Sequence, residues 1–120
     1  MSGADVTIFV CVACRGRDDA DARPGAQFLD ALRARLEARD LALTVSPVEC
    51  LAVCKRPTTV ALAGAGKWTY VVGDIDIDAH VDEVIDAALS YAASDNGIVP
   101  WKDRPVCFRK GVVSRTPPLA

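Results

Sequence analysis

Two close pairs of cysteines, 35 residues apart, constrain this chain more than any other feature. The pairs are Cys11 with Cys14 and Cys50 with Cys54, in the spacing C-x2-C-x35-C-x3-C. Each pair ends or follows a short apolar run, "VTIFVCV" or "LALTVSPV", whose β-branched or alternating residues favour a strand. A fold that unites the four thiols must therefore bring the ends of two strands together.

The rest of the pattern predicts the order strand, helix, strand, strand, strand, helix. An amphipathic helix begins near Pro24 and carries Phe28, Leu29, Leu32 and Leu36 on one stripe. The second strand is expected to end at Pro47, and "TTVALAG" and "WTYVVG" predict two more strands, joined by the glycine-containing hairpin "AGAGK". Asp78 is expected to cap the last helix, which runs from about Val81 to Asn96.

This order is that of a right-handed βαβ unit followed by a ββα unit. It predicts the α/β class and a thioredoxin-like fold, with a central mixed four-stranded sheet and a helix on each face. We expect residues 1–97 to form this thioredoxin-like domain and residues 98–120, which hold four prolines, to form an extended C-terminal tail packed on it. Because strands of a βαβ unit are parallel, both cysteine pairs should emerge at one edge of the sheet.

Four convergent thiolates suit soft-ligand sites, which means an iron-sulfur cluster or tetrahedral zinc. Basic residues directly follow the two pairs and would offset the negative charge of either site: Arg15, Arg17, Lys55 and Arg56. They do not choose between the two metals. The hydrophobic fraction of 51% supports a core without help from a metal, which argues against zinc as a folding requirement.

The segment "CLAVCKRPTTVAL" resembles the second cysteine segment of the thioredoxin-like [2Fe-2S] ferredoxins and of the related flavin-partner subunit of respiratory complex I. The resemblance spans roughly residues 5–94, although those ferredoxins usually separate their first two cysteines by more than two residues. With "GKWTYVVGD" and its tail, the whole chain is more closely similar to a bacterial family of unknown function described as predicted metal-binding proteins. Members of that family often accompany genes of cobalamin synthesis and cobalt chelation.

These resemblances imply a [2Fe-2S] cluster held by Cys11, Cys14, Cys50 and Cys54. They imply a ferredoxin-like one-electron carrier that is not an enzyme, that serves a redox partner protein (a reductase or an electron-accepting enzyme), and that has a link to cobalamin or cobalt metabolism. The alternative is Zn²⁺ on the same cysteines, in a structural or metal-handling accessory protein. Thioredoxin-type thiol chemistry is disfavoured, because about ten loop residues separate Cys14 from the helix near Pro24.

The composition and the amino terminus limit the partners, the compartment and the activities that we expect for this protein. A net charge of -2 and a pI near 5.3 give no general attraction to nucleic acid or to a membrane. The amino terminus has neither a basic leader nor a long apolar run, which predicts a cytoplasmic protein whose thiols stay reduced. With one histidine and no phosphate loop next to a helix start, no catalytic constellation is visible. A homodimer is compatible with the sequence but not decided by it.

Several single residues carry smaller expectations. Cys107 is expected to be a small buried hydrophobe and His80 an ordinary surface histidine, while Trp101 either pins the tail or faces a partner. The core is expected to take up Trp68, Tyr70 and Tyr91. The basic side chains of the tail, together with the four basic residues that follow the cysteine pairs, form a candidate docking surface. Those of the tail are Lys102, Arg104, Arg109, Lys110 and Arg115.

Overall fold

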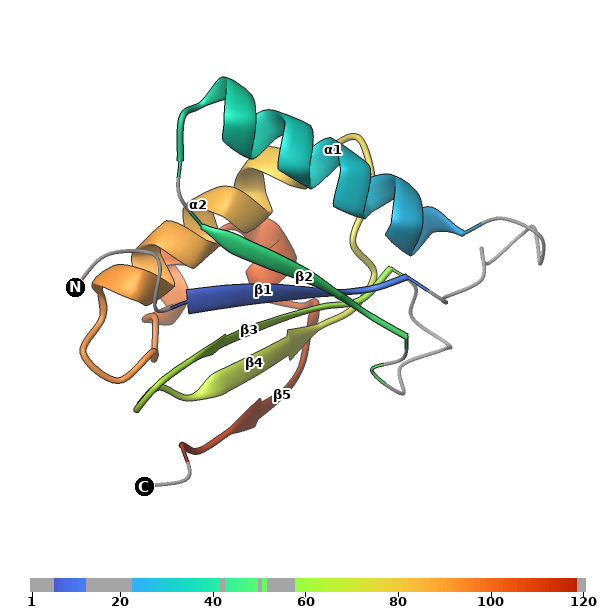
Figure 1. The fold of residues 1–120 in the computed structure, drawn as a ribbon. Helices are drawn as coiled ribbons and strands as arrows, with labels where there is room; N and C mark the ends of the chain where they lie inside the picture. Colours follow the sequence, from blue (N-terminus) through green and yellow to red (C-terminus); the bar gives the residue numbers. More distant parts are fainter. Residues whose placement is uncertain (1–5, 13–22, 42, 50, 52–57, 119–120) are drawn as a thin grey trace.

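A mixed sheet runs through the molecule in the strand order β2-β1-β3-β4-β5 (Figure 1). The computed structural model describes residues 6–12, 23–41, 43–49, 51 and 58–118. In chain order the elements are β1 (Val6–Cys11), α1 (Pro24–Ala38), β2 (Thr44–Val48), β3 (Val60–Gly64), β4 (Thr69–Val72), α2 (Val81–Ala93), the 3₁₀ turns η2 (Trp101–Asp103) and η3 (Val106–Phe108), and β5 (Val112–Thr116). Strand β1 is parallel to β2 and antiparallel to β3, and the β3/β4 and β4/β5 pairs are antiparallel.

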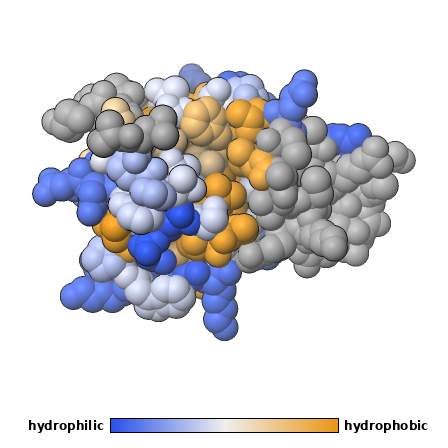
Figure 2. Space-filling model, turned by 90° about the horizontal axis from the view of Figure 1, so that it is seen from below, coloured by the Kyte–Doolittle hydropathy of each residue, from blue (hydrophilic) through white to orange (hydrophobic). Residues whose placement is uncertain are grey.

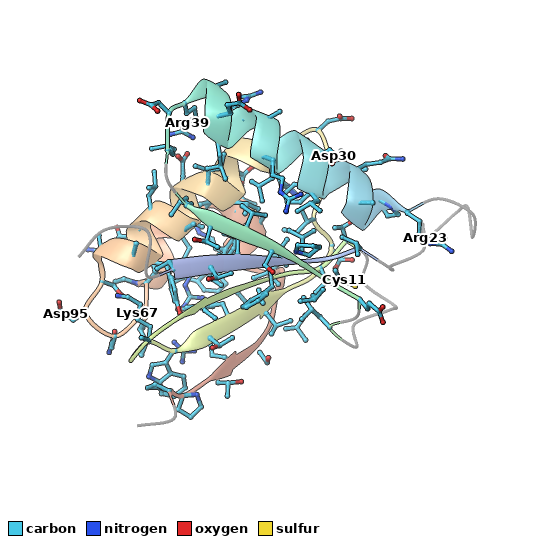
Figure 3. All side chains as sticks on the ribbon, viewed as in Figure 1. Cys11, Arg23, Asp30, Arg39, Lys67 and Asp95 are labelled. Atoms are coloured by element: carbon cyan, nitrogen blue, oxygen red, sulfur yellow. The ribbon has the colours of Figure 1, made fainter. Side chains whose placement is uncertain are left out.

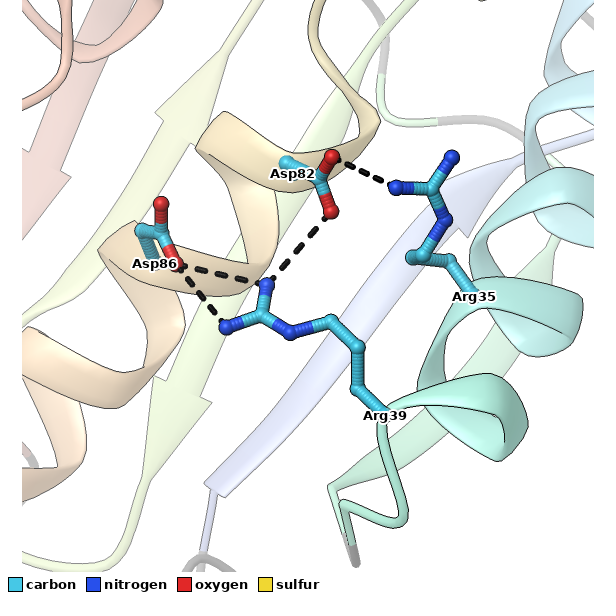
Figure 4. A network of polar contacts seen from close by, with 4 residues as sticks. All are labelled: Arg35, Arg39, Asp82 and Asp86. Carbon is cyan, nitrogen blue, oxygen red and sulfur yellow. Dashed lines mark hydrogen bonds and ion pairs between the residues drawn. The ribbon is translucent and has the colours of Figure 1, made fainter.

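Both helices lie on the same face of the sheet, so the prediction of one helix on each face is wrong (Figure 1). Ion pairs join the two helices directly (Figure 4). Arg35 Nη1 lies 2.6 Å from Asp82 Oδ2, and the Arg39 guanidinium reaches both Asp82 and Asp86 at 3.4–3.5 Å. The apolar stripe of each helix was evident in the sequence, but a stripe does not say which sheet face it covers.

The core lies between the sheet and this helical layer. Alternation along β1 directs Val6, Ile8 and Val10 toward the helices, where they meet Phe28 of α1 and Ile85 of α2. All five side chains are essentially inaccessible to solvent. Burial of each stabilises the fold by about 1.5–3 kcal/mol, so the layer between the sheet and the two helices supplies much of the stability of the domain.

The opposite face of the sheet has no helix over it among the described residues. The strand register places on it uncharged side chains from all five strands, with the apolar ones gathered in the middle (Figure 2): Thr7, Phe9, Cys11, Thr44, Ser46, Val48, Ala61, Ala63, Thr69, Val71, Ser114 and Thr116. The domain is therefore asymmetric, because its helical layer is on one face and a surface of uncharged polar and apolar side chains is on the other.

The C-terminal segment is part of the domain rather than an extended tail on its surface. Val99, Cys107 and Phe108 are buried in the core. Residues 112–116 form β5, which pairs with β4 across a bulge between Val71 and Val72. The sheet of the described chain thus has five strands where the sequence predicted four.

Two local expectations are also corrected. Pro47 lies inside β2 and pairs with Val10 instead of ending the strand. It is tolerated because β2 is an edge strand, where a missing N–H removes no ladder hydrogen bond. The expected cap by Asp78 is wrong, because His80 occupies the N-cap position of α2 and no side chain caps it. The turn before α2 is instead closed by Asp76, whose carboxylate accepts the backbone N–H groups of Asp78 and Ala79.

Candidate metal centre at one end of the sheet

Cys11 is the last residue of β1 and is held in place by backbone hydrogen bonds on both sides. Its N–H donates to the carbonyl of Thr59 at 3.0 Å, and the next N–H, that of Val12, donates to the carbonyl of Val48 at 2.9 Å. Only 1% of Cys11 is exposed. The side chain is therefore fixed at the end of the sheet from which both predicted cysteine segments leave.

The structure brings Cys11 against the start of the second cysteine segment. The Sγ of Cys11 lies 3.5 Å from the carbonyl oxygen of Glu49, to which the thiol donates. Glu49 directly precedes Cys50 in the chain. The prediction that both segments emerge at one edge is confirmed by the parallel pairing of β1 with β2. Cys14, Cys50 and Cys54 lie outside the described residues, so the four-cysteine ligand set stays a prediction.

The first turn of α1 packs directly on the backbone of Cys11. A Cβ atom on Gly25 would lie 1.7 Å from the Cys11 carbonyl oxygen, so only glycine allows this approach. Figure 3 shows Cys11 and Arg23, the residue before α1, at the same end of the molecule. The helix α1 thus begins against the backbone of Cys11, whereas the predicted separation of Cys14 from the helix lies outside the described residues.

The contact with Glu49 limits how the Cys11 sulfur can bind a metal. A thiolate at Cys11 could no longer donate to the Glu49 carbonyl. Binding a metal through Cys11 therefore requires the Glu49 carbonyl or the sulfur to move. Among the described residues, no group of three or more His, Cys, Asp or Glu side chains is placed to hold a metal ion.

Cys107 has a different environment. It is 7% exposed, and its backbone N–H donates to Glu83 Oε1 at 3.2 Å. Burial, and then the adjacent Glu83 carboxylate, raise the pKa of the Cys107 thiol to about 12. The prediction of a small buried hydrophobe is confirmed, and such a thiol stays protonated at neutral pH.

His80 has a local structural role that its sequence position did not show. Its Nδ1 accepts the backbone N–H of Asp76 at 2.8 Å, which closes the turn into α2. Hydrogen bonds from the N–H groups of Ala79 and Asp78 lower the pKa of Asp76. His80 thus helps to shape the turn beside Gly73, at the end of β4.

The predicted aromatic residues fall into two groups. Tyr70 and Tyr91 are fully buried and meet edge to face, with ring centroids 6.0 Å apart. Trp68 is half-buried, and the Arg115 guanidinium stacks over its ring. Trp101 is mostly exposed, with Arg104 over its ring. In the part of the chain that the structure describes, no helix has the length and apolar character needed to cross a membrane.

Solved structures with the same fold are thioredoxin-like [2Fe-2S] ferredoxins from Aquifex aeolicus. One matches with a TM-score of 0.62 and 19% sequence identity, over 96% of this chain and 96% of the ferredoxin. The wild-type protein in a second crystal structure gives a TM-score of 0.59 and 19% identity, over 91% and 96% of the two chains. A cysteine-to-serine variant gives 0.60 and 18%, over 91% and 98%. The fold is therefore thioredoxin-like.

The sequence comparisons place the chain in a family. No curated protein matches it. Residues 8–118 match the model of a family described as "Protein of unknown function (DUF1636)". That match includes all five cysteines and every strand but the first two residues of β1. The chain belongs to the DUF1636 family of proteins of unknown function.

Proposed function

We propose that this protein is a one-electron carrier that holds a [2Fe-2S] cluster through Cys11, Cys14, Cys50 and Cys54. One observation carries the proposal: the Cys11 sulfur lies 3.5 Å from the carbonyl oxygen of Glu49, the residue before Cys50. Two cysteine segments that are distant in sequence thus begin side by side at the end of parallel strands. The shared fold with thioredoxin-like [2Fe-2S] ferredoxins supports a cluster over zinc.

The described residues fit such a group in three ways. When bound, the cluster supplies one-electron oxidation and reduction. Cys11 would provide a thiolate ligand from a rigid strand end, and the first turn of α1 packs against the backbone of that strand end. Gly25 allows that approach. Burial of Cys11 keeps water from the ligand and limits reorganisation during electron transfer.

The proposed activity is transfer of an electron to or from a protein partner, without a catalysed reaction of its own. No feature of the described residues bears on cobalamin or cobalt chemistry, so the proposal does not extend to that pathway.

The deciding experiment is metal analysis with absorption spectroscopy on protein expressed in iron-replete, low-oxygen medium. We expect red-brown protein with two irons and two sulfides per chain, bleached by dithionite. The Cys107→Ala variant is the matched control and should keep colour and metal content. Colourless protein with one zinc per chain would overturn the proposal and establish the zinc alternative, because zinc thiolates do not absorb visible light.

A further inference from the structure

Thr59 lies directly opposite Cys11 on the neighbouring strand. The register of β1 and β3 pairs Val10 with Val60. The N–H of Cys11 donates to the carbonyl of Thr59 at 3.0 Å, which extends this antiparallel ladder by one pair. Directly opposed residues of an antiparallel pair point their side chains to the same face, with Cβ atoms about 5 Å apart. The Thr59 side chain therefore lies beside that of Cys11.

The alternation of side chains along β3 supports this placement. Val60 and Leu62 are buried in the core beneath the helices. Thr59, the residue before Val60, therefore points to the opposite face of the sheet, as Cys11 does. By the same rule Thr58 points toward the helical layer. The two adjacent threonines thus place their hydroxyl groups on different faces of the sheet, and only that of Thr59 is on the side of the Cys11 sulfur.

Backbone hydrogen bonds and burial hold both threonines in position. The carbonyl of Thr59 accepts the N–H of Cys11. The carbonyl of Thr58 accepts the N–H of Ile75, just after β4, at 3.0 Å. Thr59 is 0% exposed and Thr58 is 2% exposed, and apart from Lys67 they are the only buried polar or charged residues in the described chain. Two fully buried hydroxyl groups at the end of the sheet that holds Cys11 are therefore an exception in the way this chain fills its interior.

The surroundings of Thr59 make the Cys11 sulfur a natural acceptor for its hydroxyl group. Buried hydroxyl groups are hydrogen-bonded in most proteins, because an unpaired one is costly. The described neighbours of Thr59 on its own face are Ala61 along the strand and Phe9 diagonally across, and neither has a polar side-chain atom. The Cys11 sulfur can accept a hydrogen bond, and it accepts a stronger one as a thiolate than as a thiol.

Metal binding would change what the Cys11 sulfur needs from its neighbours. In the structure the thiol donates to the carbonyl of Glu49. A sulfur that binds a metal has lost that proton, so it only accepts hydrogen bonds. The Glu49 carbonyl cannot supply one, because a carbonyl oxygen is itself an acceptor. The Thr59 hydroxyl can, because it carries a donor and rotates to suit its partner.

We propose that Thr59 is a positioning residue, whose hydroxyl group donates to the Cys11 sulfur when that sulfur binds a metal and thereby raises the reduction potential of the candidate cluster site. Reduction adds one electron and one negative charge to the site and moves no proton. A donor to the sulfur therefore stabilises the reduced state more than the oxidised state. The effect on the potential rests on the proposed function, whereas the hydrogen bond rests on the pairing of Thr59 with Cys11.

The first test is the reduction potential of cluster-loaded protein, titrated with dithionite in the presence of redox mediators. Thr59→Val keeps the shape of the side chain and removes the hydroxyl group, so it should disfavour the reduced state about tenfold, or about 59 mV for one electron. Thr59→Ser restores a hydroxyl group and should restore the potential. Thr58→Val removes the hydroxyl group on the other face and should leave the potential unchanged. An unchanged potential in Thr59→Val, or equal shifts in Thr58→Val and Thr59→Val, would overturn the inference.

The second test separates the hydrogen bond from the redox role. Residues that hydrogen-bond a metal ligand change metal affinity by about 10–100-fold when they are replaced. Thr59→Val should therefore release the bound metal to excess EDTA about tenfold faster than the wild type, while Thr59→Ser and Thr58→Val should release it at nearly the wild-type rate. If Thr59→Val does not fold, Thr59→Ala removes the same hydroxyl group with less crowding and carries the same expectation.

This measurement gives a result with either metal. If the purified protein holds zinc, the electron-carrier role fails, and the rate of zinc release still decides whether Thr59 supports the Cys11 sulfur. Equal release rates from the wild type and from the variant that lacks the Thr59 hydroxyl group would overturn the inference whichever metal is bound. A potential that shifts together with the release rate would support both the hydrogen bond and its effect on the redox site.

Discussion

The two buried cysteines of the described chain occupy environments that differ in what they could do. Cys11 ends a strand, donates to a carbonyl that precedes another cysteine, and lies against the first turn of α1. Cys107 lies in a 3₁₀ turn, next to the carboxylate of Glu83. A thiolate is disfavoured beside a carboxylate, which argues against Cys107 as a metal ligand. The comparison teaches that burial alone does not define a metal ligand, since both thiols are buried.

The two regions nevertheless share one packing device. A Cβ atom on Gly25 would lie 1.7 Å from the Cys11 carbonyl oxygen, and one on Gly111 would lie 2.3 Å from the Cys107 carbonyl oxygen. The carbonyl of each cysteine is thus approached by a glycine, which comes from the start of α1 for Cys11 and from four residues further along the chain for Cys107. The regions can therefore be tested in matched pairs of variants.

The largest difference should appear when each cysteine is removed. We expect Cys11→Ser to lose the cluster, because an alcohol is a far weaker ligand for iron than a thiolate, while its hydroxyl can still donate to Glu49. Cys107→Ala should keep the full iron and sulfide content and lose only about 1 kcal/mol of stability from a small cavity. Absorption spectra with iron assays measure the first effect, and urea unfolding measures the second. A Cys11→Ser protein with two irons per chain would remove Cys11 from the ligand set.

The glycine pair should separate stability from metal binding. Gly25→Ala forces a Cβ into the Cys11 carbonyl, and we expect a loss of about 3 kcal/mol together with reduced cluster content. Gly111→Ala should cost about 2 kcal/mol, because the clash is with the Cys107 carbonyl at 2.3 Å, and should leave the iron content per folded chain unchanged. Urea titrations and iron assays on folded protein decide the matter. Equal iron loss in both variants would mean that metal binding follows global stability alone.

Much of the structure around the two cysteines could be predicted from the sequence, because it depends on patterns between residues that are close together along the chain. The apolar stripes and β-branched runs predicted both helices and the first four strands, and the parallel βαβ unit placed both cysteine segments at one edge. The apolar character of Cys107 also followed from its surroundings in sequence. These features depend on the period of side chains along the chain, which the sequence contains directly.

The features that could not be predicted from the sequence depend on contacts between distant segments. The approach of Gly25 to Cys11 crosses the loop between strand and helix, and nothing in "RPGAQ" signals it. The strand β5 is short and bulged, and the prolines after it masked its pairing with β4. That both helices cover the same face of the sheet depends on the strand order. The helices α1 and α2 come together only when β3 pairs with β1.

Alkaline pH should act on the Cys107 region. The folded state holds the pKa of Cys107 at about 12, against an ordinary value of 9.0, and burial raises the pKa of Tyr91 from 10.0 to about 12. Above pH 9 the unfolded chain loses protons that the folded chain retains, so stability present below pH 9 is lost as the pH rises toward 12. Urea midpoints from pH 8 to 11 should fall, and they should fall less for Cys107→Ala. Identical slopes for the two proteins would show that Cys107 does not contribute.

The smallest effect should come from the ion pairs that join the helix behind Cys11 to the helix behind Cys107. Arg39→Ala removes contacts to both Asp82 and Asp86, yet the participating side chains are one-third to more than one-half exposed. Solvent and salt screen such pairs, so we expect a loss of about 0.5 kcal/mol in low salt that disappears in 1 M NaCl, with unchanged iron content. Urea unfolding at both salt concentrations measures it, with Arg33→Ala on the same helix as the control. A loss of several kcal/mol, or a loss of cluster, would mean that the two regions are coupled through the helical layer, and the separate roles assigned to the two cysteines would then no longer hold.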